Sequence, residues 1–449
     1  MTRPPGPRER KDLPRLWSEV TRVRSGHERT ADHCDDQDQE PEFVTDPRSE
    51  PSSLLAPLRK RFDDMVARIE ELVNIDSGSF TAEGVNRMAD LCQARFEASG
   101  WKVQRQRHRL GPERVGPPLG DMVVGRRVGR RPVADGGRRL LLLAHMDTVF
   151  DEGTAAARPF RIRGGRAYGP GVTDDKAGVV CGFEAVEVLC DLVGFDDFAA
   201  ITLVCSPDEE IGSPFSRPLI EALAREHDLA VGLEAARTNG DLVSARKGIA
   251  AFTVEVEGKA VHAGVRPAEG VNAILEAAHK TVAFQALNGR WPEVTCNVGV
   301  LQGGGRITVV PDRAVMRLEV RAATTAALEQ AMAEVTRIVT TSTVPGARAQ
   351  LLWAHRHVPM ERTPAVAALV VETQAIARDL GFEVGETATG GAGDANITAA
   401  TGLPTIDGLA PVGGNAHGPD EWLDLDSVVP RTALLAGLLA RLGSRTVDD

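Results

Sequence analysis

The chain has 449 residues, of which 42% are hydrophobic and 26% are charged, a composition typical of a globular protein with two or three domains. Its formal net charge of −11 argues against a nucleic-acid-binding surface. No apolar run approaches the ~20 residues needed to span a bilayer, and no secretory signal is visible. We therefore expect a cytoplasmic protein with neither a membrane nor a nucleic acid as partner, and with reduced cysteines, because its six cysteines lack CxxC spacing.

The first predicted elements belong to a tail and to an α/β region. Residues 1–52 are rich in charged residues and proline and have almost no apolar periodicity, so we expect a disordered tail. Residues 53–247 are predicted to form the first part of a catalytic domain. It should contain helices over about 54–73, 84–99, 176–192 and 216–227, and strands over about 101–108, 122–129, 138–145, 200–206 and 229–234. Alternation of this kind predicts an α/β sandwich.

The pattern changes near residue 248, and residues 248–357 are predicted to be a separate inserted domain. Its expected elements are strand 250–257, helix 271–287, strands 293–302 and 313–320, helix 325–340 and strand 347–353. This β-α-β-β-α-β order is ferredoxin-like. Residues 358–449, with helices over 365–380 and 428–442 and a strand over 404–407, should complete the catalytic domain. The predicted fold class is α/β, with a catalytic sandwich domain interrupted by a ferredoxin-like α+β domain.

A histidine and an aspartate follow the most apolar predicted strand. Residues 140–149 read LLLLAHMDTV, so His145 and Asp147 stand at the end of a strand buried on both faces. Chemistry gathers at the carboxyl ends of such strands. Residues two apart on an extended segment point the same way, so Asp147 can hydrogen-bond one nitrogen of His145 and leave the other for a metal. The alternative is a core histidine paired with a turn aspartate.

Four further segments place carboxylates or imidazole in predicted loops. They are GPGVTDDK at 169–176, SPDEEIG at 206–212, VGLE at 231–234 and GGNAHGPDE at 413–421. Each also fits a structural role as a helix start, a solvated loop or a surface residue. Together they supply the nitrogen and oxygen ligands that zinc prefers, and enough carboxylates for one to bridge two ions. The sequence therefore predicts a co-catalytic metal site.

These motifs, together with His-Ala-Gly at 262–264 and TGGAGDAN at 389–396, which both precede the segment at 413–421, resemble the di-zinc aminoacylase/carboxypeptidase family in their order along the chain. Within it the chain is most similar to the glutamate carboxypeptidases, with acetylornithine deacetylase and succinyl-diaminopimelate desuccinylase as relatives. The resemblance covers about residues 54–442. It implies two divalent ions per chain, with zinc as the expected metal and Co²⁺ or Mn²⁺ as alternatives.

The resemblance also implies roles for individual residues. One ion would be held by His145 and Glu234, the other by Glu210 and His417, and Asp174 would bridge the two. The peptide bond after Asp174 is cis in that family. Glu209 would take a proton from the bridging water. Neighbours on an extended segment point in opposite directions, so Glu210 can be a ligand while Glu209 is the base.

The inserted domain carries three further expected site residues. The resemblance implies that His262 stabilises the tetrahedral oxyanion, usually across a homodimer formed through this domain. Arg321 matches an arginine that clamps the substrate's α-carboxylate, a task suited to the bidentate guanidinium. In GGGRITVVP at 303–311, Thr308 stands where the family usually has asparagine, and Arg306 is a nearby cation. Threonine can donate only one hydrogen bond, with a shorter reach.

Three functions remain open from the sequence. The first is a metallo-carboxypeptidase or amidohydrolase that cleaves an amide next to a free carboxylate of a small molecule or short peptide. The second is an N-acyl amino acid deacylase with the same catalytic residues and a different acyl pocket. The third is a non-catalytic binding protein on this scaffold, which the presence of Glu209 beside all five expected ligands argues against.

Overall fold

The computed structural model describes residues 46–109 and 117–443. Most of the predicted disordered tail, residues 1–45, lies outside this range. Residues 46–52 lie inside it, and there Arg48 forms an ion pair with Asp197 at 3.0 Å. No helix within the described ranges is both long enough and apolar enough to cross a membrane.

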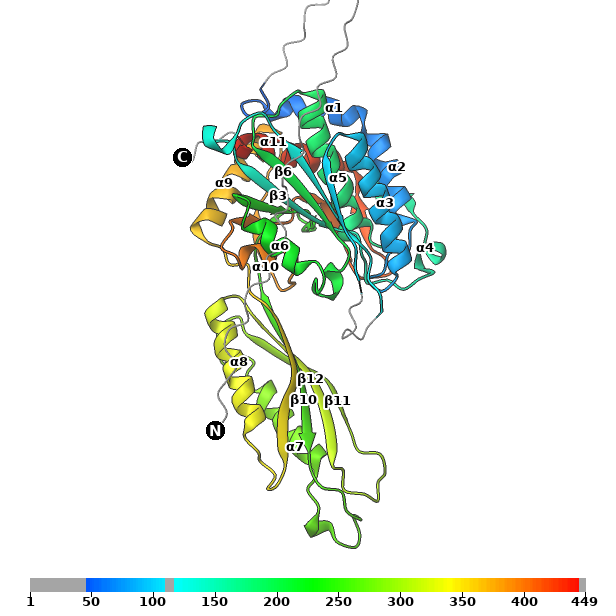
Figure 1. Cartoon of the computed structure of the whole chain (residues 1–449), viewed down its shortest axis with the longest axis vertical. Helices are drawn as coiled ribbons and strands as arrows, with labels where there is room; N and C mark the ends of the chain where they lie inside the picture. Colours follow the sequence, from blue (N-terminus) through cyan, green and yellow to red (C-terminus); the bar gives the residue numbers. More distant parts are fainter. Residues whose placement is uncertain (1–45, 110–116, 444–449) are drawn as a thin grey trace, which may run out of the picture. The chain divides into compact units, whose positions relative to one another are not determined.

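The catalytic domain is built on a six-stranded sheet in the order β1-β2-β6-β3-β7-β15. Its strands are β1 (Lys102–Gln106), β2 (Met122–Val128), β3 (Arg139–His145), β6 (Ala200–Ser206), β7 (Leu229–Gly232) and β15 (Thr405–Ile406). Two of these strands, β3 and β6, are labelled in Figure 1. The central strand β3 pairs in parallel with both β6 and β7. Leucines 140 to 143 are all buried, as expected for a strand covered on both faces.

The catalytic domain also contains helices. They are α1 (Leu55–Lys60), α2 (Phe62–Val73), α3 (Ala82–Ala98), α4 (Thr154–Ala157), α5 (Ala177–Glu187), α6 (Arg217–Ala224), α9 (Pro364–Asp379), α10 (Asp394–Ala399) and α11 (Val428–Gly443). The single helix expected over 54–73 is divided at Arg61 into α1 and α2. Helix α5 packs on β3 and on α11, and residues of all three elements belong to the catalytic-domain core.

Two small sheets were not predicted. One has five strands in the order β4-β5-β17-β16-β8, and the other pairs β14 with β9. Their bounds are β4 (Arg161–Arg163), β5 (Arg166–Tyr168), β8 (Ala235–Ala236), β9 (Leu242–Arg246), β14 (Glu386–Thr389), β16 (Ala410–Gly414) and β17 (Trp422–Asp424). Strands of two to five residues are too short to show a clear alternation of apolar and polar residues.

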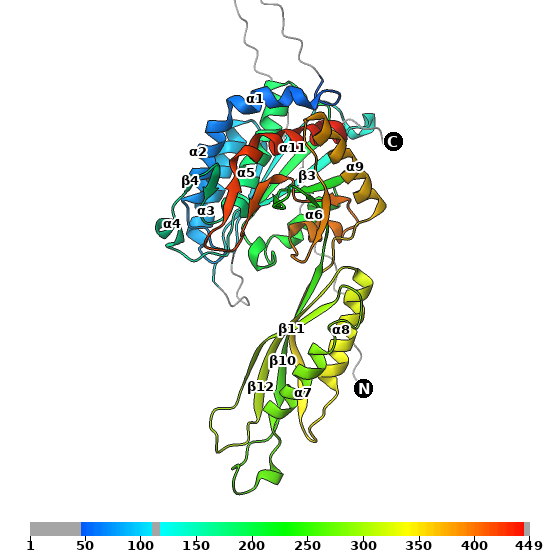
Figure 2. The same ribbon diagram turned by 180° about the vertical axis from the view of Figure 1, so that it is seen from behind.

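The inserted domain has the predicted ferredoxin-like order. Its elements are β10 (Gly248–Glu257), α7 (Ala273–Gln285), β11 (Thr295–Gly303), β12 (Arg313–Ala322), α8 (Thr325–Thr340) and β13 (Arg348–His357). The strands form an antiparallel sheet in the order β11-β12-β10-β13. Alternate residues of β10 are buried, and α7 and α8 lie on one face of the sheet (Figure 2). The domain therefore has a hydrophobic core of its own.

Candidate metal centre and active site

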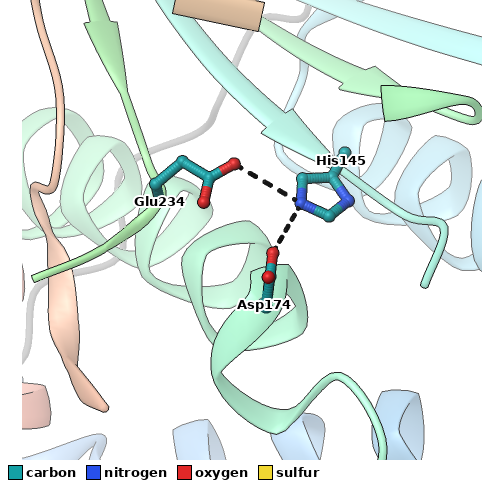
Figure 3. Close-up of side chains that lie close together, drawn as sticks. All are labelled: His145, Asp174 and Glu234. Carbon is teal, nitrogen blue, oxygen red and sulfur yellow. Dashed lines mark hydrogen bonds and ion pairs between the residues drawn. The ribbon is translucent and has the colours of Figure 1, made fainter. Parts of the chain in front are cut away.

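One group of possible metal ligands gathers at the carboxyl end of β3. His145 Nε2 lies 3.0 Å from Asp174 Oδ1 and 3.6 Å from Glu234 Oε1. Figure 3 shows the two carboxylates converging on this ring nitrogen. The other nitrogen, Nδ1, is 3.0 Å from the backbone carbonyl oxygen of Asp147 and 3.4 Å from Asp147 Oδ1. Both parts of Asp147 thus face Nδ1, and Nε2 points at the carboxylates.

A second group shares Asp174 with the first. His417 Nε2 lies 3.1 Å from Asp174 Oδ2 and 3.1 Å from Glu210 Oε2. Asp174 therefore offers one oxygen to each histidine, which is the arrangement expected of a bridging carboxylate. The peptide bond between Asp174 and Asp175 is cis, as the family resemblance implied. The five expected ligands form two overlapping groups of three.

The charges of this cluster favour bound cations. Burial lowers the pKa of His145, but its hydrogen bonds with acidic side chains raise that pKa well above the usual value. The hydrogen bonds of His417 with Asp174 and Glu210 raise its pKa to about 10. In the protein alone, protons on the histidines offset the negative charge of the carboxylates. Two divalent ions can replace those protons, because neutral imidazole and carboxylate are the donors that zinc prefers.

Glu209 is adjacent to the expected ligand Glu210 but belongs to neither group of three. Burial raises its pKa well above the usual glutamate value. Its backbone N–H donates to Asp147 Oδ1 at 3.0 Å, and the N–H of Glu210 donates to Asp147 Oδ2 at 3.2 Å. The Ser79 hydroxyl also donates to Asp147 Oδ2, at 2.6 Å. Asp147 therefore holds the segment that carries Glu209 through hydrogen bonds. Ser79, which holds Asp147 in turn, was not predicted from the sequence.

Glu421 is a second residue that the sequence analysis left without a role. Its buried carboxylate accepts hydrogen bonds from the backbone N–H groups of Gly171 at 2.9 Å, Thr173 at 2.9 Å and Asp174 at 3.2 Å. Because Glu421 follows the loop of His417, it joins that loop to the turn bearing the shared Asp174. The only sequence signal was an acid at the end of the 413–421 motif.

The glycine-rich segment at 389–396 supports the same site from the other side. The carboxylate of Asp394 accepts a hydrogen bond from the Ser206 hydroxyl at 2.7 Å, and a further one from the Ser213 hydroxyl. These serines flank the segment of Glu209 and Glu210. A cavity of about 400 Å³ opens between these loops, and Glu209 lines it together with four of the expected ligands, Asp174, Glu210, Glu234 and His417. Two arginines, Arg237 and Arg246, also line it.

The three expected site residues of the inserted domain lie apart from the cluster. His262 is exposed, and its Nδ1 accepts a hydrogen bond from the N–H of Gly264 at 3.1 Å. The N–H of Ala263 donates to the carbonyl oxygen of Thr308 at 2.9 Å, so His262 and Thr308 belong to one pair of facing segments. Within the described residues, no contact joins either of them to the five ligands. Their catalytic roles stay predictions.

The guanidinium of Arg321 forms an ion pair with an acidic side chain of its own strand. Its Nε and Nη2 donate to the two carboxylate oxygens of Glu319, at 2.9 and 3.1 Å. Its Nη1 donates to the carbonyl oxygen of Gly390 at 2.7 Å. Both sides of the guanidinium are therefore occupied, and the carboxylate clamp expected from the sequence stays a prediction.

Comparison with known sequences agrees with this geometry. A model of peptidase family M20/M25/M40 matches residues 141–441. Carboxypeptidase G2 from Pseudomonas sp. (strain RS-16) is 30% identical over 383 residues, which cover 85% of this chain and 89% of that protein. Acetylornithine deacetylase from Myxococcus xanthus is 32% identical over 260 residues, which cover 55% of this chain and 63% of that protein.

Solved structures share the fold. A tripeptidase from Staphylococcus aureus superposes with a TM-score of 0.69 at 21% identity, covering 86% of this chain and 99% of that chain. An M20 metallo-carboxypeptidase from Sulfolobus solfataricus gives a TM-score of 0.65 at 17% identity, covering 84% and 99%. The chain belongs to peptidase family M20/M25/M40 and is an enzyme of this metallopeptidase family.

Proposed function

We propose that this enzyme hydrolyses an amide or peptide bond next to a free carboxylate, in small molecules or short peptides, as a glutamate carboxypeptidase does. The observation that carries the proposal is the position of Glu209, a carboxylate outside two ligand groups that share Asp174. The similarity to carboxypeptidase G2 along most of both chains supports this substrate class.

Two divalent ions would complete the site. His145, Asp174 and Glu234 would hold one, and Asp174, Glu210 and His417 the other. Zinc fits these nitrogen and oxygen donors best, and Co²⁺ or Mn²⁺ can use the same set. When bound, such ions polarise the scissile carbonyl group and make water more acidic.

Glu209 would act as the general base. It lines the cavity, and Asp147 holds its backbone through the N–H group. A carboxylate in this place can take the proton of the attacking water and later give it to the leaving amine. Because Glu209 is not a ligand, it is free to change its protonation state while the ligands stay in place.

The inserted domain would supply the hydrogen-bond donor for the oxyanion. We propose that His262 donates a hydrogen bond to the oxyanion from the partner chain of a homodimer, because in its own chain it lies outside the cluster. Thr308, paired with the neighbouring Ala263, would lie beside it. The homodimer and a cytoplasmic location are both predictions from the sequence.

An N-acyl amino acid deacylase is the second candidate function. It is favoured by the match to acetylornithine deacetylase, although this match covers only 55% of the chain. The two functions share the metal groups and the base and differ in the group bound on the acyl side. Hydrolysis of N-acetyl amino acids compared with dipeptides ending in glutamate, measured on zinc-loaded enzyme, separates them. Turnover of the dipeptides at least as efficient as that of the acetyl compounds is expected, and the reverse order would favour the deacylase.

A further inference from the structure

We propose that Arg237, rather than Arg321, binds the free carboxylate of the substrate. This inference rests on the proposed function, because it assumes that the substrate carries such a group. It assigns a specificity-determining role to a residue that lies in the cavity itself, three positions after the ligand Glu234.

The strand pairing explains how Arg237 reaches the site. Strand β8 runs parallel to β16, with Ala236 opposite Val412. Arg237 therefore leaves β8 at the level where β16 runs into the loop that carries His417. Its backbone N–H donates to the carbonyl oxygen of Asp241 at 3.1 Å, which holds the start of this turn in place. A turn closed by a backbone hydrogen bond, next to Glu234 and to the loop of His417, is a suitable place for a residue that orients the substrate.

The guanidinium of Arg237 has no acidic partner among residues 46–109 and 117–443. Its Nη2 donates to the carbonyl oxygen of Ala235 at 3.1 Å, and its buried Nε has no hydrogen-bond partner in the part of the chain that the structure describes. No described carboxylate forms an ion pair with it. A partly buried guanidinium that lacks a counter-charge loses hydration without compensation. An anionic group of a ligand would supply the missing partner.

Two other arginines, Arg246 in the cavity lining and Arg321 in β12, already pair with acidic side chains. Arg246 is buried, its Nε donates to Asp407 Oδ2 at 2.7 Å, and its Nη2 lies 3.7 Å from Glu234 Oε2. Arg321 holds both oxygens of Glu319. Recruiting either arginine to a substrate would first require the loss of an existing ion pair, whereas Arg237 needs no such exchange.

The chemistry of the ligand follows from the site. Four carboxylates line the cavity near Arg237, namely Asp174, Glu209, Glu210 and Glu234. Two bound divalent ions would offset these charges, so that an anion can enter. A carboxylate suits the planar guanidinium, which can donate two parallel N–H bonds to it. Bound in this way, the substrate would present its amide bond toward Glu209.

Steady-state kinetics on matched substrates test the inference. The substrates are an N-acyl amino acid with a free α-carboxylate and the same compound as its primary amide. The variants are Arg237→Gln, Arg237→Lys and Arg321→Met, with Arg225→Met, at an exposed arginine just after α6, as the surface control. We expect Arg237→Gln to lower kcat/KM for the free acid by about 10- to 100-fold, mainly through KM, with little effect on the amide. Arg237→Lys should lose part of the preference, because it keeps the charge without the fork.

The possible results distinguish a failure of the proposed function from a failure of the role assigned to Arg237. Equal hydrolysis of acid and amide by the unmutated enzyme would overturn the proposed function. A preference for the acid that survives in Arg237→Gln and disappears in Arg321→Met would overturn the inference alone. Equal losses on both substrates in Arg237→Gln would also overturn it, because they indicate a structural role. If Arg237→Gln has a lowered Tm, the test uses Arg237→Lys instead. If the ratio of kcat/KM for the acid to kcat/KM for the amide is unchanged in that variant, the proposal is contradicted.

Discussion

The carboxylate of Asp147 accepts a hydrogen bond from the backbone N–H of Glu209, with 3.0 Å between the two atoms. The same residue faces Nδ1 of His145 through its carbonyl oxygen and its side chain. One aspartate thus connects the first expected metal ligand, on β3, to the segment after β6 that carries the proposed base. This connection explains how two residues that are far apart in the sequence keep a fixed relative position.

Replacing the base should separate metal binding from turnover. Glu209→Gln is expected to retain both ions, because it removes no ligand, and to lose about 10²- to 10⁴-fold in kcat, the usual loss for a general base. Elemental analysis and steady-state kinetics on the same preparation check both parts. Near-normal kcat would show that another group accepts the proton.

His262 should act on catalysis without acting on the metals. His262→Ala is expected to lower kcat by about 10²- to 10³-fold at unchanged metal content, the usual loss for one oxyanion donor. If His262 acts across a dimer, mixing this variant with Glu209→Gln should restore activity, because each hybrid dimer has one site with both residues intact. Absence of recovery after confirmed subunit exchange would place His262 in its own chain's site or outside the mechanism.

Glu421 should matter for metal affinity although it is not a ligand. In Glu421→Gln an amide group faces backbone N–H groups that now donate to a carboxylate, so the turn bearing Asp174 should shift. Affinity for the ions is expected to fall by about 10- to 100-fold, as for other residues that support ligands. Competition with a chelator measures this. Asp420→Asn, at the neighbouring exposed acid, is the matched control and should keep full affinity.

His227 should make the stability of the catalytic domain depend on pH. It is buried, Nδ1 donates to the carbonyl oxygen of Leu223 at 2.7 Å, and Nε2 accepts from the Thr202 hydroxyl at 2.8 Å. Burial lowers its pKa from 6.5 to about 4. Between these values the unfolded chain binds the proton and the folded chain does not, so this contribution to stability is lost as the pH falls from 6.5 toward 4.

The variant His227→Gln isolates this effect. From pH 7.5 to pH 4.5, the free energy of unfolding of the unmutated protein should fall by about 2–3 kcal/mol more than that of the variant. Urea titrations of the metal-free proteins at the two pH values give the change in unfolding free energy for each protein. The expected metal ligands are the same in both proteins, so their titration cancels in the comparison. The same pH dependence in both proteins would show that His227 is not held in its neutral form.

The sequence predicted the central strands and the gathering of possible metal ligands because both depend on local patterns. Four buried leucines before His145 indicate a strand buried on both faces, and the position just past its end is where ligands gather. The short strands β8 and β16 carry no such pattern, so the sheet that places Arg237 beside the His417 loop was missed. Ser79 and Glu421 were missed for a different reason. Each acts through hydrogen bonds to residues distant in sequence, and a single serine or glutamate gives no sign of such a partner.

Arg321 illustrates the limit of a motif. The resemblance identified its position, but the side chain of Glu319, two residues earlier in the same strand, occupies its guanidinium. Whether a substrate displaces an existing ion pair depends on relative free energies, and a matching residue type does not determine these.

Metal stoichiometry tests the central claim, a two-ion hydrolytic site in which Asp174 is shared. Zinc-loaded, desalted enzyme should contain two ions per chain by elemental analysis, with hydrolytic activity rising as the ions are added back to metal-free protein. Asp174→Ala should lose affinity for both ions, because each ligand group contains this residue. One ion or fewer in the fully loaded, active enzyme, or two tightly bound ions in Asp174→Ala, would contradict the account.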